Sequence, residues 1–157
     1  MLRTIVIGLG LLALAACSPP QASDSSPGPG EAAAQTASAA PAGAETTITA
    51  WYREQLGNQL IEPVSIFFGD FTGDGAPDAL AWGDFDTGGS SANHLVALFR
   101  NQGGRMVHWR NDETVFGQEP RDVSISHGRI TLTTTMPRPG DPHCCPTGEQ
   151  SWTINAN

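Results

Sequence analysis

The amino-acid sequence predicts an α+β fold, in which an N-terminal helix packs on an antiparallel β-sheet of about seven short strands. The first observation is a run of apolar residues at helical spacing that begins near Thr46. The second is a series of short apolar segments of strand length. The third is the turn chemistry between them, because Asn101–Gly104 and His127–Gly128 each join two such segments.

The helix is predicted to open at Thr46, where a threonine can cap its first turn. Pro63 is expected to end it, because proline cannot continue a helical hydrogen-bond ladder. The apolar positions that share one face of this helix are Ile48, Trp51, Tyr52, Leu56 and Leu60.

The predicted strands follow the helix, and the threonine-rich segment near residue 133 is the most strongly strand-favouring of them. The predicted segments are Val64–Phe68, Asp78–Gly83, His94–Arg100, Arg105–Arg110, Val123–Ser126, Arg129–Thr135 and Trp152–Ile154.

The N-terminus carries a secretory signal, with a charge at Arg3, a short apolar stretch and small residues before Cys17. The stretch Thr4–Ala16 is too short for a membrane-spanning helix, which needs roughly 20 residues. The segment Leu14–Cys17 resembles the lipobox of bacterial lipoproteins. The resemblance implies that residues 1–16 are removed, that Cys17 is acylated, and that the protein is lipid-anchored in the cell envelope. In Gram-negative lipoproteins, Ser18 after the cysteine implies an outer-membrane location facing the periplasm.

Residues 17–45 are predicted to be the acylated cysteine and a disordered linker. Of the 28 residues from Ser18 to Glu45, 22 are Ala, Ser, Pro or Gly, so the segment cannot bury enough apolar surface to order itself. Its r.m.s. reach is roughly 30 Å. Residues 46–157 are predicted to form a single globular, β-rich domain of ordinary size.

The predicted domain is acidic, with seven arginines against thirteen Asp and Glu residues and a formal charge of −6. Such a charge argues against nucleic acid and favours a basic or envelope protein as partner. The stretch between Arg53 and Arg100 contains no Lys or Arg; a solvated acidic face is the alternative explanation of this pattern. Its acidic residues are Glu54, Glu62, Asp70, Asp74, Asp78, Asp84 and Asp86.

One loop in this stretch has the composition of a calcium site. Asp70, Asp74 and Asp78 place carboxylates at positions 1, 5 and 9 of a glycine-containing loop. The hydroxyl of Thr72 and the carbonyl of Ala76 are the further candidate ligands. The loop resembles the calcium loop of FG-GAP and VCBS-type repeats, which implies Ca²⁺ as a structural cofactor. Thr72 departs from the Asn or Asp of those repeats, and an Asp/Gly turn without metal is the alternative.

A second candidate site is the segment that contains His143, Cys144 and Cys145. With Cys17 consumed by lipid, the adjacent cysteines have no other intramolecular partner in an oxidising compartment. Three interpretations remain open: a strained disulfide between neighbours, two partly buried thiols, or a redox or soft-metal site. In the last, Met136 joins the His-Cys-Cys segment as a ligand for Cu(I) or Zn.

No hydrolase, zinc-protease or P-loop motif occurs, and the sequence assigns no catalytic residue. The segment Arg129–Trp152 resembles the C-terminal end of small uncharacterised secreted bacterial proteins and carries no activity. The sequence favours a lipid-anchored envelope protein with a non-enzymatic binding or structural domain, stabilised by calcium. The alternative is a periplasmic thiol-redox or soft-metal-handling protein that uses His143, Cys144 and Cys145.

Overall fold

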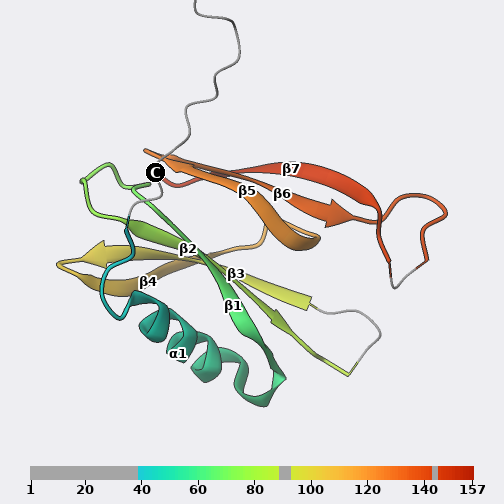
Figure 1. Ribbon diagram of the computed structural model, residues 1–157, viewed down its shortest axis with the longest axis horizontal. Coiled ribbons are helices and arrows are strands. Elements are labelled where there is room, and N and C mark those ends of the chain that lie inside the picture. The colour runs from blue at the N-terminus through green and yellow to red at the C-terminus, as the bar shows by residue number, and fades with distance from the viewer. Residues whose placement is uncertain (1–38, 89–92, 143–144) are drawn as a thin grey trace, which may run out of the picture. The chain divides into compact units, whose positions relative to one another are not determined.

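The computed structural model describes residues 39–88, 93–142 and 145–157, and it folds them into one α-helix, one 3-10 turn and seven strands (Figure 1). Helix α1 spans Ala44–Leu56, and η1 spans Gly57–Gln59. The strands are β1 (Leu60–Gly69), β2 (Asp78–Phe85), β3 (Asn93–Gln102), β4 (Arg105–Asp112), β5 (Gln118–Ser126), β6 (Arg129–Met136) and β7 (Gly148–Asn155).

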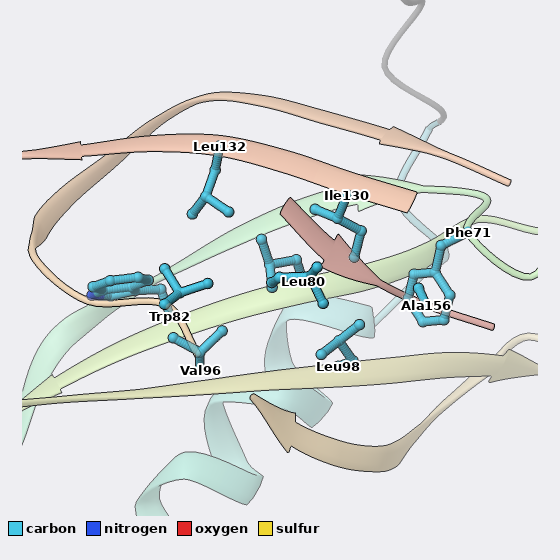
Figure 2. Packing of buried hydrophobic residues seen from close by; sticks show 10 residues of the cluster. Phe71, Leu80, Trp82, Val96, Leu98, Ile130, Leu132 and Ala156 are labelled. Atoms are coloured by element: carbon cyan, nitrogen blue, oxygen red, sulfur yellow. The ribbon is translucent and has the colours of Figure 1, made fainter. Parts of the chain in front are cut away.

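The strands form two antiparallel sheets that face one another. The first sheet has the order β1-β2-β3-β4, and the second has the order β5-β6-β7. Apolar side chains of both sheets meet between them, where Leu132 and Ile130 point toward Leu80 and Leu98 (Figure 2). Helix α1 packs on the other face of the first sheet, against a second apolar cluster. The described residues are therefore layered as helix, sheet and sheet.

Strands β2 and β3 separate the two apolar clusters, because successive side chains of a strand point to opposite faces. On β2, Leu80 and Trp82 contribute to the core between the sheets, whereas Ala79 and Ala81 face the helix. The small residues on the helical face let α1 approach the sheet closely. A Cβ at Gly83 would overlap the ring of Tyr52, so only glycine leaves that ring its place.

Tyr52 fixes the helix on the sheet. Its side chain is fully buried, and its hydroxyl lies 2.9 Å from the carbonyl oxygen of Ala81 and 2.8 Å from that of Leu95. Burial raises the pKa of this phenol far above its ordinary value, so the hydroxyl stays protonated and donates. At the exposed end of the helix, Arg53 pairs with Glu62 on β1 at 2.7 Å.

The structure confirms one helix and seven antiparallel strands, but the predicted single sheet is wrong. The chain leaves the first sheet after β4 and enters the second at β5, so these consecutive strands do not pair. Val115 lies in this crossing and is buried in the core between the sheets. Both predicted hairpin turns are confirmed: β3 and β4 flank Gly103–Gly104, and β5 and β6 flank His127–Gly128.

The helix boundaries also differ from the prediction. Helix α1 begins at Ala44, and the hydroxyl of Thr47 donates to the carbonyl of Gly43 instead of capping an N–H group. The helix ends at Leu56, and Leu60 is already part of β1. Pro63 lies within β1, between residues where the register shifts, after a cis peptide bond. An edge strand tolerates proline there because the missing N–H faces no neighbour.

Strands β5 and β7 are longer than the predicted Val123–Ser126 and Trp152–Ile154. Of the residues that the structure describes, none belongs to a helix with the length and apolar character needed to cross a bilayer.

Candidate functional site

The acidic loop between β1 and β2 is held by its own carboxylates. Oδ1 of Asp70 accepts the N–H groups of Gly73 at 2.6 Å and Asp74 at 3.2 Å, and Oδ2 accepts that of Gly75 at 2.8 Å. Burial raises the pKa of Asp70, but these hydrogen bonds together outweigh it and hold the pKa below its usual value. Asp70 therefore organises the loop as a charged acceptor of backbone donors.

Asp78, at the start of β2, is fully buried and also accepts hydrogen bonds from the loop. Its Oδ2 accepts the N–H of Thr72 at 3.0 Å and the hydroxyl of the same residue at 2.9 Å. Its Oδ1 accepts the N–H of Asn101 on β3 at 2.9 Å. The carboxylate thus ties the loop to the neighbouring strand, and its burial is matched by three hydrogen bonds.

The five predicted calcium ligands lie in one loop, but they are bonded to one another and to the backbone. Asp74 accepts the N–H of Ala76 at 2.8 Å, and Thr72 also contacts Asp70 at 3.3 Å. Among the described residues, no group of three or more His, Cys, Asp and Glu side chains is arranged to hold a metal ion. As arranged, the loop fits a hydrogen-bonded turn, and calcium binding stays a prediction.

The same loop joins the two sheets at one end of the molecule, which we call the closed end. The N–H of Gly128 in the β5–β6 turn donates to the carbonyl of Phe71 at 2.7 Å, and the N–H of Ala156 donates to the carbonyl of Gly128 at 2.9 Å. A Cβ at Gly73 would overlap the imidazole of His127. The sequence singled out the loop and the turn separately, and the structure brings them into contact.

The acidic stretch predicted as one feature is divided in space. Asp78 and Asp84 lie six residues apart on β2, or about 20 Å at the rise of a strand. Asp84 accepts the indole N–H of Trp82 at 2.8 Å, and Glu62 is paired with Arg53. The acidic residues therefore do not form one continuous face. A basic partner stays a prediction.

At the opposite end of β2, the sheets leave a groove of about 770 Å³ between them, which we call the open end. Its walls come from the ends of β2, β3, β4 and β6, from the crossing between β4 and β5, and from the β6–β7 loop. The side chains that line the groove include His94, Asp112, Val115, Phe116, Met136 and Arg138. The volume suits a small-molecule ligand.

The apolar part of the groove is built on a stack of rings. The imidazole of His94 lies over Trp82, with ring centroids 4.3 Å apart, and its Nε2 is 3.0 Å from the carbonyl oxygen of Val115. Phe116 contacts the rings of His94 and Trp152 edge-on, and yet it is 54% exposed. The ring of Phe116 is therefore available for contact in the lining of the groove, and aromatic side chains are common in ligand pockets.

The backbone carbonyl of Phe116 is held in place by hydrogen bonds that involve the buried Thr134. The hydroxyl of Thr134 donates to the carbonyl of Phe116 at 2.6 Å, and it accepts the indole N–H of Trp152 at 2.8 Å. Each group satisfies the next, so the buried polar atoms are paired. The exposed ring is therefore presented from a firmly held backbone.

The charged side of the groove is also organised by hydrogen bonds. Asp112 is buried, and its Oδ1 accepts the N–H and the hydroxyl of Thr114 at 3.0 and 2.6 Å. Its Oδ2 lies 3.3 Å from the guanidinium of Arg110. Arg138, from the β6–β7 loop, adds an exposed positive charge to the lining. The groove thus combines an apolar patch with charges of both signs.

The β6–β7 loop is pinned by Asp141. One oxygen of this carboxylate accepts the N–H groups of Arg138 at 2.7 Å and Thr147 at 2.8 Å; the other accepts the hydroxyl of Thr147 at 3.0 Å. These hydrogen bonds hold the pKa of Asp141 below its usual value, and the bond from the Arg138 N–H has the largest effect. Pro142 and Pro146 of the same loop line the groove.

Several predicted residues lie outside the described residues: the signal and lipobox with Cys17, most of the linker, and His143 and Cys144. Of the second candidate site, the structure describes Cys145, which is exposed, and Met136, which lines the groove. The N–H of Cys145 donates to the carbonyl of Pro142 at 3.0 Å.

The groove itself was not predicted from the sequence. Its lining comes from segments that are distant along the chain, so no local motif marks it. The one available signal was Phe116, an aromatic residue beside Gly117, outside every predicted strand. Comparison of the chain with protein-family models, with curated proteins and with solved structures found no match. The function is therefore argued from the geometry of the groove.

Proposed function

We propose that this chain is a lipid-anchored cell-envelope protein whose two-sheet domain is a non-enzymatic binding module, with the groove at the open end as its binding site. The single observation that carries the proposal is the groove itself, with an exposed Phe116 on a fixed backbone. Apolar lining with a few fixed polar groups is typical of ligand sites.

The chemistry of the lining supports an amphipathic ligand. Phe116 and Met136 offer apolar contact, and Arg138 offers a charge that pairs with an anionic group of the ligand, whereas the exposed Glu113 adds a negative charge to the same lining. Asp112 is already bonded to Arg110 and Thr114, so it is expected to shape the site more than to bind.

The anchor and the location rest on the sequence motif at Leu14–Cys17. Acylation of Cys17 would hold the protein at the membrane, because several acyl chains give stable attachment. The linker would then let the domain reach roughly 30 Å from the surface. Metabolic labelling with palmitate tests this part: the wild type should incorporate label, and Cys17→Ala should not.

The groove is tested with an anionic apolar dye, 8-anilinonaphthalene-1-sulfonate, and two matched variants. Phe116→Ser changes an exposed apolar residue in the groove; Ile61→Ser changes one that is 44% exposed and outside it. Serine is used in both so that no new cation attracts the sulfonate. We expect dye fluorescence to be lost in Phe116→Ser and kept in Ile61→Ser, with both variants folded by circular dichroism. Equal binding by both variants would remove the groove from the proposal.

The alternative, thiol-redox or soft-metal handling, has one observation in its favour. Cys145 is exposed in a loop whose flanking prolines line the groove. The alternative predicts that the full chain binds Cu(I) or reacts with a thiol reagent, and that Cys144→Ser/Cys145→Ser loses this property without unfolding. Equal uptake or labelling in that double variant would reject it.

A further inference from the structure

The four edge strands of the two sheets are not equally protected. Strands β1 and β4 bound the first sheet, and β5 and β7 bound the second. An edge strand presents unpaired N–H and C=O groups, and proteins protect such edges with proline, bulges and charges.

Three edges carry clear protection. Strand β1 contains Pro63 and a register shift. Strand β5 contains Pro120, two register shifts, and positive φ angles at Glu119 and Asp122. Strand β4 has an irregular register with β3 and contains charged residues, Arg110 among them. Each of these features interrupts the regular ladder that a further strand would need.

Strand β7 lacks both proline and register shifts. It pairs with β6 through eight consecutive residue pairs without a register shift, from Arg129↔Asn155 to Met136↔Gly148. It contains no proline, and its only charged residue is Glu149. Among the strands that the structure describes, β6 is its sole pairing partner. The β6–β7 ladder is therefore regular along the whole of β7, whose opposite edge bounds the second sheet.

The direction of the backbone groups on β7 follows from two observations. The N–H of Ala156 donates to Gly128, which extends the β6–β7 ladder, so even-numbered residues of β7 direct their N–H and C=O toward β6. Odd-numbered residues then direct theirs to the free edge. The odd carbonyls of Ser151 and Asn155 indeed accept side-chain donors, from Gln150 at 3.0 Å and Arg110 at 2.6 Å.

We propose that β7 pairs antiparallel with β7 of a second copy, about a twofold axis through Ser151. In both copies the odd-numbered residues of β7 carry the outward N–H and C=O groups, so the two strands can pair only in registers that match odd residues with odd residues. In the register centred on Ser151, Ser151 lies opposite Ser151 of the second copy, and Glu149 lies opposite Thr153 of the second copy. The two Glu149 charges then lie four residues apart, or about 13 Å, so no like charges are opposed.

A second copy fits as the partner of β7 because the outward N–H and C=O groups of two β7 strands match one another in this register. Ser151 faces Ser151 as a narrow pair that exchanges two hydrogen bonds, and each Glu149–Thr153 pair exchanges two more. On dimerisation, the hydrogen bond from the Gln150 side chain to the Ser151 carbonyl would be replaced by one from the second copy. The Asn155 carbonyl, at the end of the strand, would stay bonded to Arg110. One strand pair buries less than the roughly 1,200 Å² of a stable interface, so the dimer should dissociate on dilution.

The test is sedimentation velocity of the full chain in detergent micelles over a concentration series. We expect a monomer–dimer equilibrium. Ser151→Pro removes an outward N–H without touching the β6 ladder, and it should weaken dimerisation by at least about tenfold. Ser151→Ala keeps the N–H and should dimerise like the wild type. A monomer at every concentration, or a Ser151→Pro protein that dimerises normally, would overturn the proposal.

A second measurement holds even if Ser151→Pro does not fold. In a chain whose native cysteines are replaced by serine, Ser151→Cys should form an intermolecular disulfide on mild oxidation. The Cα atoms of a narrow pair lie about 5.5 Å apart, within the range of disulfides. Thr153→Cys is the matched control, because in this register Thr153 lies far from its own copy. Equal crosslinking of both variants, or none in Ser151→Cys, would reject the twofold axis at Ser151.

Discussion

The two ends of the sandwich are built in opposite ways. At the closed end, backbone hydrogen bonds run from Ala156 to Gly128 and from Gly128 to Phe71, so the two sheets and the acidic loop form one network. At the open end, the sheets are linked by the crossing between β4 and β5, and a groove remains between them. At the closed end the carboxylates of Asp70 and Asp78 accept backbone N–H groups, and the open end presents an aromatic ring to solvent.

This difference separates stability from binding. Carboxylates at the closed end, such as the buried Asp78, accept backbone N–H groups, and their removal leaves partly buried donors unpaired. Phe116 at the open end is exposed, so its ring contributes little to burial and is free to contact a ligand. Substitutions should therefore affect stability at the closed end and binding at the open end.

The largest effect is expected for Asp78→Ala. This change leaves the N–H groups of Thr72 and Asn101 without their acceptor in a buried position, which should lower the free energy of unfolding by about 3 kcal/mol. Asp78→Asn keeps one oxygen acceptor and should cost less. Urea denaturation measures both variants, and a stability loss under 1 kcal/mol for Asp78→Ala would contradict the role given to the closed end.

Calcium gives the next effect, and it tests the closed end directly. If the calcium site predicted from the sequence forms, millimolar Ca²⁺ should raise the melting temperature of the full chain by several degrees over the value in excess EDTA, because binding only to the folded state stabilises it. Asp74→Ala should remove the increase while leaving the hydrogen bonds of Asp70 and Asp78 in place. Identical melting curves in calcium and EDTA would reject calcium binding and leave the hydrogen-bonded turn.

The sequence predicted the local elements well, since helical spacing at Ile48 and Tyr52 and the turn at Asn101–Gly104 are local signals. It missed the second sheet, because hairpin signals do not say whether β4 pairs with β5. The signal in the sequence was indirect: Leu80 and Trp82 alternate with alanines, so β2 needs a layer on each face.

The candidate sites divide in the same way. The acidic loop is contiguous, so composition pointed to it, but the identity of each carboxylate's partner depends on folding. Asp78 finds Asn101 from a strand 23 residues away. The groove brings together residues as distant as Phe85 and Pro146, and no spacing rule connects them. Pro63 misled the prediction for a physical reason, because proline both ends helices and occupies edge strands.

A smaller, local effect is expected from acid at the β6–β7 loop. The pKa of Asp141 lies below its unfolded value, so its hydrogen bonds stabilise the loop above about pH 4 and are lost as the pH falls through the lower, folded pKa. The protection of the Arg138 and Thr147 amides against hydrogen exchange, relative to their intrinsic exchange rates, should fall in that window. Asp141→Asn should show the lower protection already at pH 7, and pH-independent protection in the wild type would contradict the role of this carboxylate.

The smallest effect on stability is expected where the effect on binding is largest. Phe116→Ala removes an exposed ring, so the free energy of unfolding should change by about 0.5 kcal/mol or less. The backbone beneath it should stay in place, because the hydroxyl of Thr134 bonds to the carbonyl of Phe116 and not to its side chain. Dye binding should nevertheless fall strongly. If Phe116→Ala unfolds the domain instead, the ring is part of the core, and the open end is not a site kept free for a ligand.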